Sequence, residues 1–144
     1  MNTKINNFEI TIHAPIESVW NATATTAGLA AWAPTIRIET DWNVGSPVTY
    51  TCYDEQGSVA EWEGKKMIWS GMIETLDKPH VFSCVYSDST NGIERETYTL
   101  DSIDENTTRV TLEQLCTTAE IAEKYKPGTA EMMEMMKKFL ETHK

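Results

Sequence analysis

The sequence has few basic residues: 12 lysines and arginines stand against 22 aspartates and glutamates, which gives a net charge of −10. Nucleic acids and anionic membranes are bound by clustered Lys and Arg side chains, so neither is expected as a partner. Long apolar runs are also missing, because no stretch approaches the roughly 18 apolar residues of a membrane span. The N-terminal residues lack the apolar core of a signal peptide, and we therefore expect a cytoplasmic protein.

Cysteine and histidine are equally scarce, with three residues of each. Cys52, Cys84 and Cys116 form no CxxC pair and are odd in number, so they indicate neither a disulfide framework nor a zinc site. Each lies in a strand-like run, where a free cysteine is more often a small buried hydrophobe than a reactive thiol. The histidines stand alone in the sequence. We therefore expect no metal and no other cofactor.

The 144 residues, 40 % of them apolar, suit one ordinary globular domain spanning 1–144. Residues 8–13 alternate apolar and polar side chains, which predicts a half-buried strand. Apolar residues at helical spacing then predict two short helices, over 15–22 and 27–32. Neither is long enough to be stable alone, so Trp20 and Trp32 are expected to anchor them by packing.

From residue 36 onward the apolar period changes to two, which predicts a series of strands. Because no helix separates them, consecutive strands should pair as antiparallel neighbours. Gly71, near the centre of the longest strand, is expected to permit a bulge or a bend. The six expected strands cover residues 36–42, 47–53, 66–76, 81–86, 93–100 and 108–116.

The C-terminal residues return to a helical pattern. Thr117 and Glu120 have the spacing of a capping box, and Pro127-Gly128 is expected to break or kink the helix. Beyond the proline, apolar residues form a stripe along one face of the helix. This face must be buried, and only the sheet is large enough to cover it. The predicted fold is therefore α+β, in the order β-α-α-β-β-β-β-β-β-α: a curved antiparallel sheet of six to seven strands wraps around the C-terminal helix. The stripe contains Met132, Met133, Met136, Phe139 and Leu140.

Three stretches resemble a known superfamily: "APIESVWNA" followed by "GLAAW", then "WSGMIETLDKPHVFSCVY", then "TRVTLEQL" followed by the long helix. Together they resemble the START-like superfamily, also called SRPBCC or helix-grip. Within it, the chain is most similar to bacterial proteins related to the activator of heat-shock-protein-90 ATPase and to the polyketide cyclase/dehydrase group. The resemblance implies a cavity between helix and sheet for a small apolar ligand, closed at one end by the two short helices. It implies no single activity, because lipid carriers, hormone receptors, aromatases and cyclases share the fold.

Strand alternation and helical spacing predict which side chains would line such a cavity. The same side chains could instead fill a solid core, since a stripe of methionines on a helix more often belongs to a packed core than to a ligand-binding site. A register error of one residue would also reverse the assignment for any strand. The expected ligand-binding residues are Trp32, Tyr50, Trp69, Ile73, Phe82, Cys84, Tyr86, Tyr98, Leu112, Gln114, Met132, Met133, Met136 and Leu140.

Glu96 and Gln114 are the polar exceptions among these inward positions. A carboxylate facing an apolar groove would have a raised pKa and could act as an acid or a base. The preferred alternative places Glu96 in water through a bulge, because Glu is rarely buried without a partner. Glu74 is expected on the outer face of the sheet, in an ion pair with a neighbouring strand, and Trp62 near the mouth of the groove.

Three functions follow, of which binding of a small lipid-like or aromatic, polyketide-like molecule without catalysis is favoured. The alternative is a cyclase-, aromatase- or hydrolase-type enzyme using Glu96 with Tyr50 or Tyr98 for proton transfer. The sequence shows no nucleophile elbow, phosphate loop or metal cluster, and these three residues are weak catalytic candidates. The third function is a stress-related, co-chaperone-like interaction domain. It is the weakest, because no separate chaperone-binding region is visible. We expect a monomer or a weak dimer.

Overall fold

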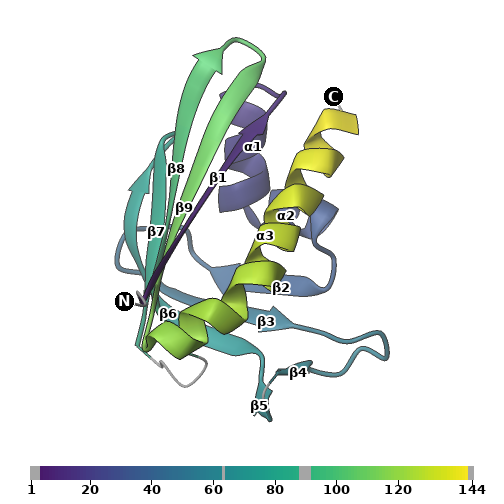
Figure 1. The fold of residues 1–144 in the computed structure, drawn as a ribbon. Helices are drawn as coiled ribbons and strands as arrows, with labels where there is room; N and C mark the ends of the chain where they lie inside the picture. Colours follow the sequence, from purple (N-terminus) through teal and green to yellow (C-terminus); the bar gives the residue numbers. More distant parts are fainter. Residues whose placement is uncertain (1–3, 63, 88–91, 143–144) are drawn as a thin grey trace.

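The computed structural model describes residues 4–62, 64–87 and 92–142. Figure 1 shows their arrangement: two short helices follow the first strand, and a long helix follows the last. The helices are α1 (Ile16–Ala24), α2 (Thr26–Trp32) and α3 (Ala119–Thr142). The strands are β1 (Ile5–Ile12), β2 (Ile36–Thr40), β3 (Pro47–Cys52), β4 (Glu61–Trp62), β5 (Lys65–Lys66), β6 (Ile68–Asp77), β7 (Val81–Tyr86), β8 (Ile93–Asp104) and β9 (Thr107–Cys116).

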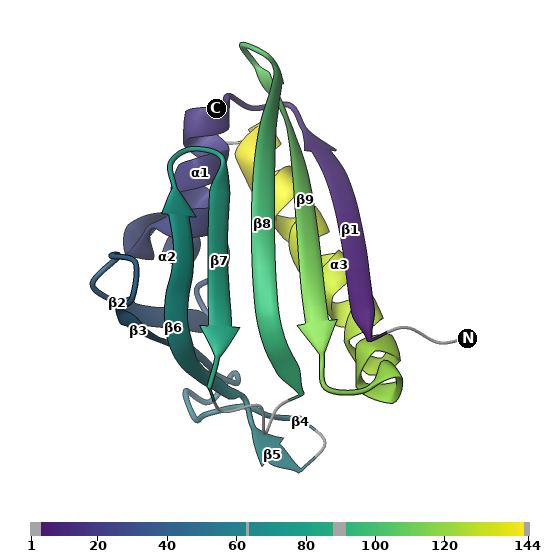
Figure 2. The same ribbon diagram turned by 90° about the vertical axis from the view of Figure 1, so that its left-hand side faces the viewer.

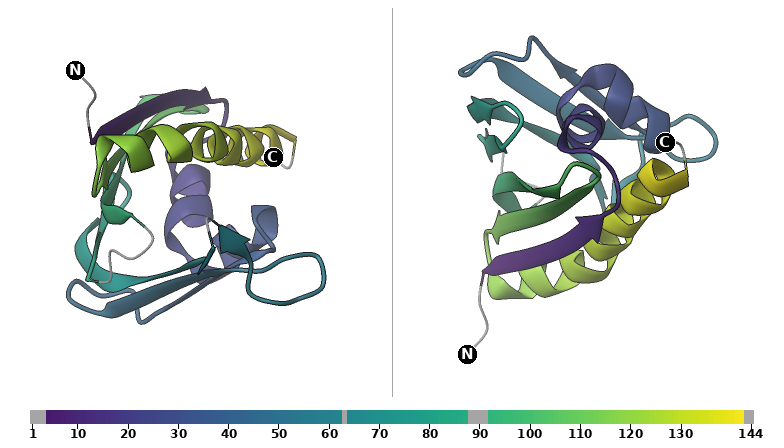
Figure 3. Two further views of the ribbon diagram at one scale, coloured as in Figure 1. Left: turned by 60° about the horizontal axis from the view of Figure 1, so that its bottom comes forward. Right: turned by 90° about the horizontal axis from the view of Figure 1, so that it is seen from above.

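Seven of these strands form one antiparallel sheet in the order β1-β9-β8-β7-β6-β3-β2. Figure 2 shows β6 to β9 and β1 side by side, with α3 behind them. Figure 3 shows α3 lying along β1, and α1 and α2 between α3 and the pair β2–β3. The predicted helix-grip fold is confirmed. No helix in the described part of the chain is long and apolar enough to cross a bilayer.

The two short helices are joined at Thr25, which ends α1 and caps α2. Its side-chain oxygen accepts the Gly28 N–H at 3.0 Å, as an N-cap does. The indole N–H of Trp32 donates to the Ala22 carbonyl at 2.8 Å, which ties the second helix back to the first. Trp20 and Trp32 are both buried, so the expected tryptophan anchors are in place.

Polar contacts hold α3 to β1 near both ends of the helix. At its start, the Asn6 side-chain amide donates to the Ala122 carbonyl at 2.7 Å. Near its other end, the Lys137 ammonium donates to the Thr11 carbonyl at 2.6 Å and to Glu141 at 2.8 Å. Glu141 in turn accepts the His13 N–H at 2.8 Å. The helix is therefore fixed at two places along β1.

Several local predictions about α3 and the sheet need correction. The helix begins one residue later than expected, since Thr118, not Thr117, accepts the Ile121 N–H at 3.1 Å. Pro127 lies inside a continuous helix, so of the two expected outcomes, a break or a kink, the break is absent. Figure 1 shows instead that the helix axis bends, as expected where proline removes a hydrogen bond. The hairpin β4–β5 was not predicted, because two-residue strands carry no readable period.

Gly71 lies where three strands approach closely. It pairs with Val48 on β3 and with Tyr86 on β7. A Cβ atom at this position would overlap the backbone of Val85 and Tyr86. The expected bulge is not at the glycine, because the register shift falls between Ile73 and Thr75. Gly71 is therefore required for the close approach of β7.

Gly71→Ala and Gly128→Ala should change stability in opposite directions. Gly71→Ala forces two backbones apart, and we expect it to lower the free energy of unfolding by about 2 kcal/mol. Gly128 is helical with open space around its Cα, so alanine there should raise the same quantity by about 0.5–1 kcal/mol. Urea denaturation of both variants measures these changes. Equal effects of the two substitutions would contradict the role given to Gly71.

Candidate functional site

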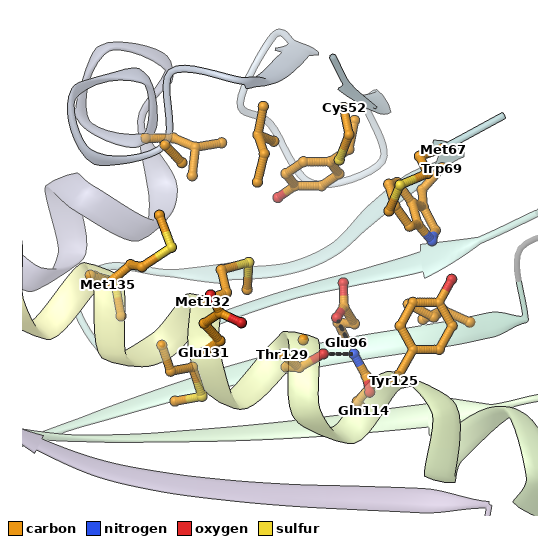
Figure 4. A pocket seen from close by; sticks show the side chains of 18 of the residues that line it. Cys52, Met67, Trp69, Glu96, Gln114, Tyr125, Thr129, Glu131, Met132 and Met135 are labelled. Atoms are coloured by element: carbon orange, nitrogen blue, oxygen red, sulfur yellow. Dashed lines mark hydrogen bonds between the residues drawn. The ribbon is translucent and has the colours of Figure 1, made fainter. Parts of the chain in front are cut away.

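A cavity of about 530 Å³ lies between α3 and the concave face of the sheet. Its walls come from α1, α2, α3 and most strands of the sheet, together with Trp62 of β4. Most lining side chains are apolar or aromatic, as Figure 4 shows. The interior is therefore not a solid core at this place.

Eleven of the fourteen side chains expected at the cavity line it. Strand parity was thus assigned correctly for β3, β6, β7, β8 and β9. These residues are Trp32, Tyr50, Trp69, Phe82, Cys84, Tyr86, Tyr98, Gln114, Met132, Met133 and Met136.

Three expected residues, Ile73, Leu112 and Leu140, do not line the cavity, and for them the prediction is corrected. Ile73 and Leu112 are fully buried and Leu140 nearly so. Ile73 and Leu112 point to the expected, concave face of the sheet, and Leu140 lies on the expected face of α3. The cavity, however, extends along only part of the concave face. Where α3 packs against β9 and the short helices cover the sheet, inward side chains meet protein atoms instead of open space.

Tyr125, Thr129 and Met135 line the cavity although the sequence analysis did not assign them there. Tyr125 and Thr129 are one helical turn apart and continue the stripe that includes Met132 and Met136. The signal was present in the sequence. Tyr125 was missed because the break or kink expected at Pro127 separated it from the stripe.

The mouth of the cavity is marked by its exposed lining residues. They lie on one face of α3 and in the connection from α2 to β2. Trp62 adds a half-buried ring at this side, packed on Tyr125 with ring centroids 4.6 Å apart, so it lies near the mouth as predicted. The exposed lining residues are Pro34, Thr35, Lys124, Gly128, Glu131 and Met135.

The Glu96 carboxyl group lies inside the cavity, not in water. Its Oε1 atom accepts the Tyr86 hydroxyl at 3.1 Å, and Oε2 accepts the Gln114 amide at 3.0 Å. The solvent-facing prediction is therefore wrong. Glu is rarely buried without a partner, and Glu96 follows this rule, because the Tyr86 hydroxyl and the Gln114 amide both donate to it. The part of Glu96 that remains accessible faces the cavity.

The orientation of the Gln114 side chain follows from Asn6. The Asn6 Nδ2 group must face the Ala122 carbonyl, which can only accept. Its second proton goes to Gln114 Oε1 at 3.1 Å. The Gln114 Nε2 group is then directed to Glu96 and to the Thr129 hydroxyl, at 3.0 and 3.2 Å. A chain of buried amides thus presents a donor to the carboxyl group.

The ionisable groups around Glu96 are held in their neutral forms. Burial raises the pKa of Glu96, and the hydrogen bonds from Gln114 and Tyr86 lower it by less. Burial, with the nearby Glu96 charge adding to it, raises the pKa of the Cys84 thiol to about 12 and of Cys52 to about 11. The two cysteines at the cavity are therefore poor nucleophiles at neutral pH.

The tyrosines expected to assist Glu96 have other arrangements. Burial raises the pKa of the Tyr50 and Tyr98 hydroxyls, with Glu96 a smaller cause. Tyr98 stacks on Phe82, with ring planes 10° apart. Among the tyrosines, the hydroxyl that donates to Glu96 in the described structure is that of Tyr86. The described residues also include no group of three side chains able to hold a metal ion.

Glu74 lies on the opposite, outer face of the sheet. Arg95 donates to both of its carboxylate oxygens at 3.0 Å, and the Ser83 hydroxyl to one of them at 3.2 Å. The predicted outer-face ion pair is present, although its partner lies on β8, beyond the adjacent strand β7. This carboxylate is partly exposed and separate from the cavity.

Comparison with protein families gives one match. Residues 13–143 fit the family described as "Activator of Hsp90 ATPase homolog 1-like protein". A search of curated protein sequences finds no match.

Solved structures with a similar fold cover nearly all of this chain. ChR145 from Cytophaga hutchinsonii has 22 % identity and a TM-score of 0.73, covering 99 % of this chain and 97 % of its own. Norcoclaurine synthase from Thalictrum flavum, in complex with dopamine and hydroxybenzaldehyde, has 14 % identity and a TM-score of 0.62, over 97 % and 87 %. The di-domain ARO/CYC protein BexL of the BE-7585A biosynthetic pathway has 16 % identity and a TM-score of 0.72, over 92 % and 45 %. At these identities the likeness establishes the fold alone.

Glu96→Gln should alter how stability depends on pH. Because the pKa of Glu96 is raised in the folded protein, the folded state binds this proton more tightly than the unfolded state. The wild-type protein therefore loses stability as pH rises from the unfolded pKa through the folded one, and the Gln variant lacks this loss. The melting temperature of Glu96→Gln, relative to wild type, should be higher at about pH 8 than at about pH 4.5. Exposed Glu105→Gln is the control for removal of one charge, and an identical pH profile for both variants would contradict a raised pKa of Glu96.

Proposed function

This chain belongs to the Activator of Hsp90 ATPase homolog 1-like protein family, and we propose that it binds a small lipid-like or aromatic molecule in its cavity without transforming it. The cavity itself carries this proposal. Its volume of about 530 Å³ lies within the range of small-molecule sites, and its lining is apolar with a few converging polar groups.

The composition of the wall supports a binding role. Four methionines of α3 line the cavity: Met132, Met133, Met135 and Met136. Their unbranched, polarizable side chains adapt to ligands of different shape. The aromatic side chains opposite them, from β3, β6, β7 and β8, give a rigid apolar surface. A site of this kind suits a ligand held mainly by contact area.

The similar structures support a small ligand of aromatic character. One of them is described with dopamine and hydroxybenzaldehyde bound, and another is an ARO/CYC protein of a biosynthetic pathway. These properties belong to those proteins. They make aromatic compounds a sensible first group to test on this chain.

Proton-transfer catalysis is a second candidate, favoured by one observation. The Glu96 carboxyl has a raised pKa and reaches the cavity, which are the requirements for a general acid or base. Mass spectrometry of the bound compound after incubation distinguishes the two functions. A binding protein returns the compound unchanged, whereas an enzyme converts it at a rate that falls in Glu96→Gln.

A chaperone partner, which the family description suggests, has less support. The large apolar side chains exposed in the described part of the chain belong to different elements. They are Ile5 on β1, Val44 between β2 and β3, Met72 on β6, Ile103 near the end of β8 and Met135 on α3. A docking surface of this kind would need them in one contiguous patch.

An amide NMR titration tests the binding function directly. Fatty acids, sterols, flavonoids and polyketide-like aromatics are added to labelled protein. We expect at least one class to shift the signals of Tyr50, Trp69, Cys84 and Tyr98, together with α3 from Met132 to Met136. Absence of shifts at these residues with every class would contradict the proposal.

A blocked cavity provides the matched control for this titration. Cys52 lines the cavity, and Cys52→Phe adds a ring to its interior. We expect at least a tenfold loss of affinity for the best compound, roughly the effect of one unfavourable steric contact of about 1.4 kcal/mol. Ile103→Phe adds the same ring at an exposed position outside the cavity and should bind like wild type. Unchanged affinity in Cys52→Phe would place the ligand elsewhere.

A further inference from the structure

We propose that the cavity selects an apolar molecule carrying a neutral hydroxyl group, an alcohol or a phenol, which donates to Glu96 and accepts from Trp69. This selectivity rests on the proposed binding function and adds to it the chemical class of the ligand. The two protein groups are independent observations: one is a buried acceptor with unused capacity, and the other is a buried donor without an acceptor.

The Glu96 carboxyl group has acceptor capacity that the protein does not use. Its two oxygens offer about four lone-pair positions, and Tyr86 and Gln114 occupy one on each oxygen. Figure 4 shows a carboxyl oxygen of Glu96 directed into the cavity. Among the described lining residues, the basic side chain is Lys124, which is exposed at the mouth. The carboxyl group can therefore accept a further hydrogen bond from a bound molecule.

The indole N–H of Trp69 is the complementary group. Trp69 is only 9 % exposed and lines the cavity, and its Nε1 atom has no hydrogen-bond partner among the described residues. Indole can only donate, and a buried donor without an acceptor is rare in folded proteins. Figure 4 shows Nε1 directed toward the side of the cavity where the Tyr125 hydroxyl lies.

Tyr125 marks the end of the cavity at which the two groups lie. Figure 4 shows Trp69, Tyr125 and Glu96 at this end, away from Met135. The Trp69 N–H meets no acceptor at hydrogen-bonding geometry there. A polar atom of a ligand near Tyr125 would lie within the influence of both.

A hydroxyl group satisfies both requirements with one atom, since it donates one proton and accepts through its lone pairs. An ether or a ketone only accepts, and would leave Glu96 without the extra donor. An ammonium group only donates, and would leave Trp69 without an acceptor. A carboxylate would be repelled by an ionised Glu96. The preference for a hydroxyl over an ether or a ketone holds for the ionised Glu96 carboxylate, since a protonated carboxyl group would donate to all three.

A ligand series on one skeleton tests the selectivity in wild-type protein. The compounds are naphthalene, 2-naphthol, 2-methoxynaphthalene, 2-naphthylmethylamine and 2-naphthoate, measured by calorimetry at neutral pH. We expect 2-naphthol to bind about tenfold more tightly than naphthalene or the methyl ether, the effect of one hydrogen bond to a charged group. The carboxylate should bind most weakly.

Two variants assign this preference to the named groups. Glu96→Gln should reduce the advantage of 2-naphthol over its methyl ether to about twofold or less, and Trp69→Phe should reduce it in part. Glu74→Gln removes a carboxylate on the opposite face of the sheet, outside the cavity, and should keep the full tenfold preference, of about the size of one hydrogen bond.

The possible outcomes separate this inference from the binding function. Equal affinities of naphthalene, 2-methoxynaphthalene and 2-naphthol would overturn the hydroxyl preference. They would still support binding of apolar molecules in the cavity. Tightest binding of the amine or the carboxylate would also overturn it. No binding of any compound would contradict both proposals. If Glu96→Gln does not fold, the affinities measured with wild-type protein still test both the hydroxyl preference and the binding function.

Discussion

The buried amide of Asn6 is the contact on which the polar end of the cavity depends. It belongs to β1, yet it donates to Gln114 on β9 and to the Ala122 carbonyl on α3. The Ala122 carbonyl can only accept, so it fixes which way both amides face. This orientation presents an N–H to Glu96 and makes a buried carboxyl group tolerable. With Asn6 replaced by an apolar residue, Gln114 could turn over and direct its oxygen at the carboxylate.

The polar contacts of α3 with β1 also explain how a cavity of this size persists under a long helix. The helix is held to β1 near its start by Asn6 and near its end by Lys137 and Glu141. Between these places it presents methionines to the cavity. Polar contacts therefore support the helix at both ends, while the buried Met133 and Met136 between them belong to the core and also line the cavity.

The sequence predicts the parts of this structure that depend on local periodicity. The alternation of Phe82, Cys84 and Tyr86 is regular, and their inward direction was assigned correctly. Alternation also placed Glu96 at an inward position, but the solvated alternative was preferred because its partners Tyr86 and Gln114 lie on other strands, and alternation does not show which side chains meet across the sheet. For the C-terminal helix, the sequence left open whether Pro127 breaks or kinks it, because local pattern does not show that residues on both sides of the proline are buried and keep the helix continuous.

The pairing of β1 with β9 has a consequence for how the protein is made. Asn6 and Gln114 are 108 positions apart in the chain, and α3 follows β9. A ribosome releases residue 6 long before it adds the residues that Asn6 must contact. The first strand must therefore wait, unpaired, until β9 and the start of α3 have been synthesised. Contacts of such long range form slowly, so the binding site should be among the last features to mature during biosynthesis.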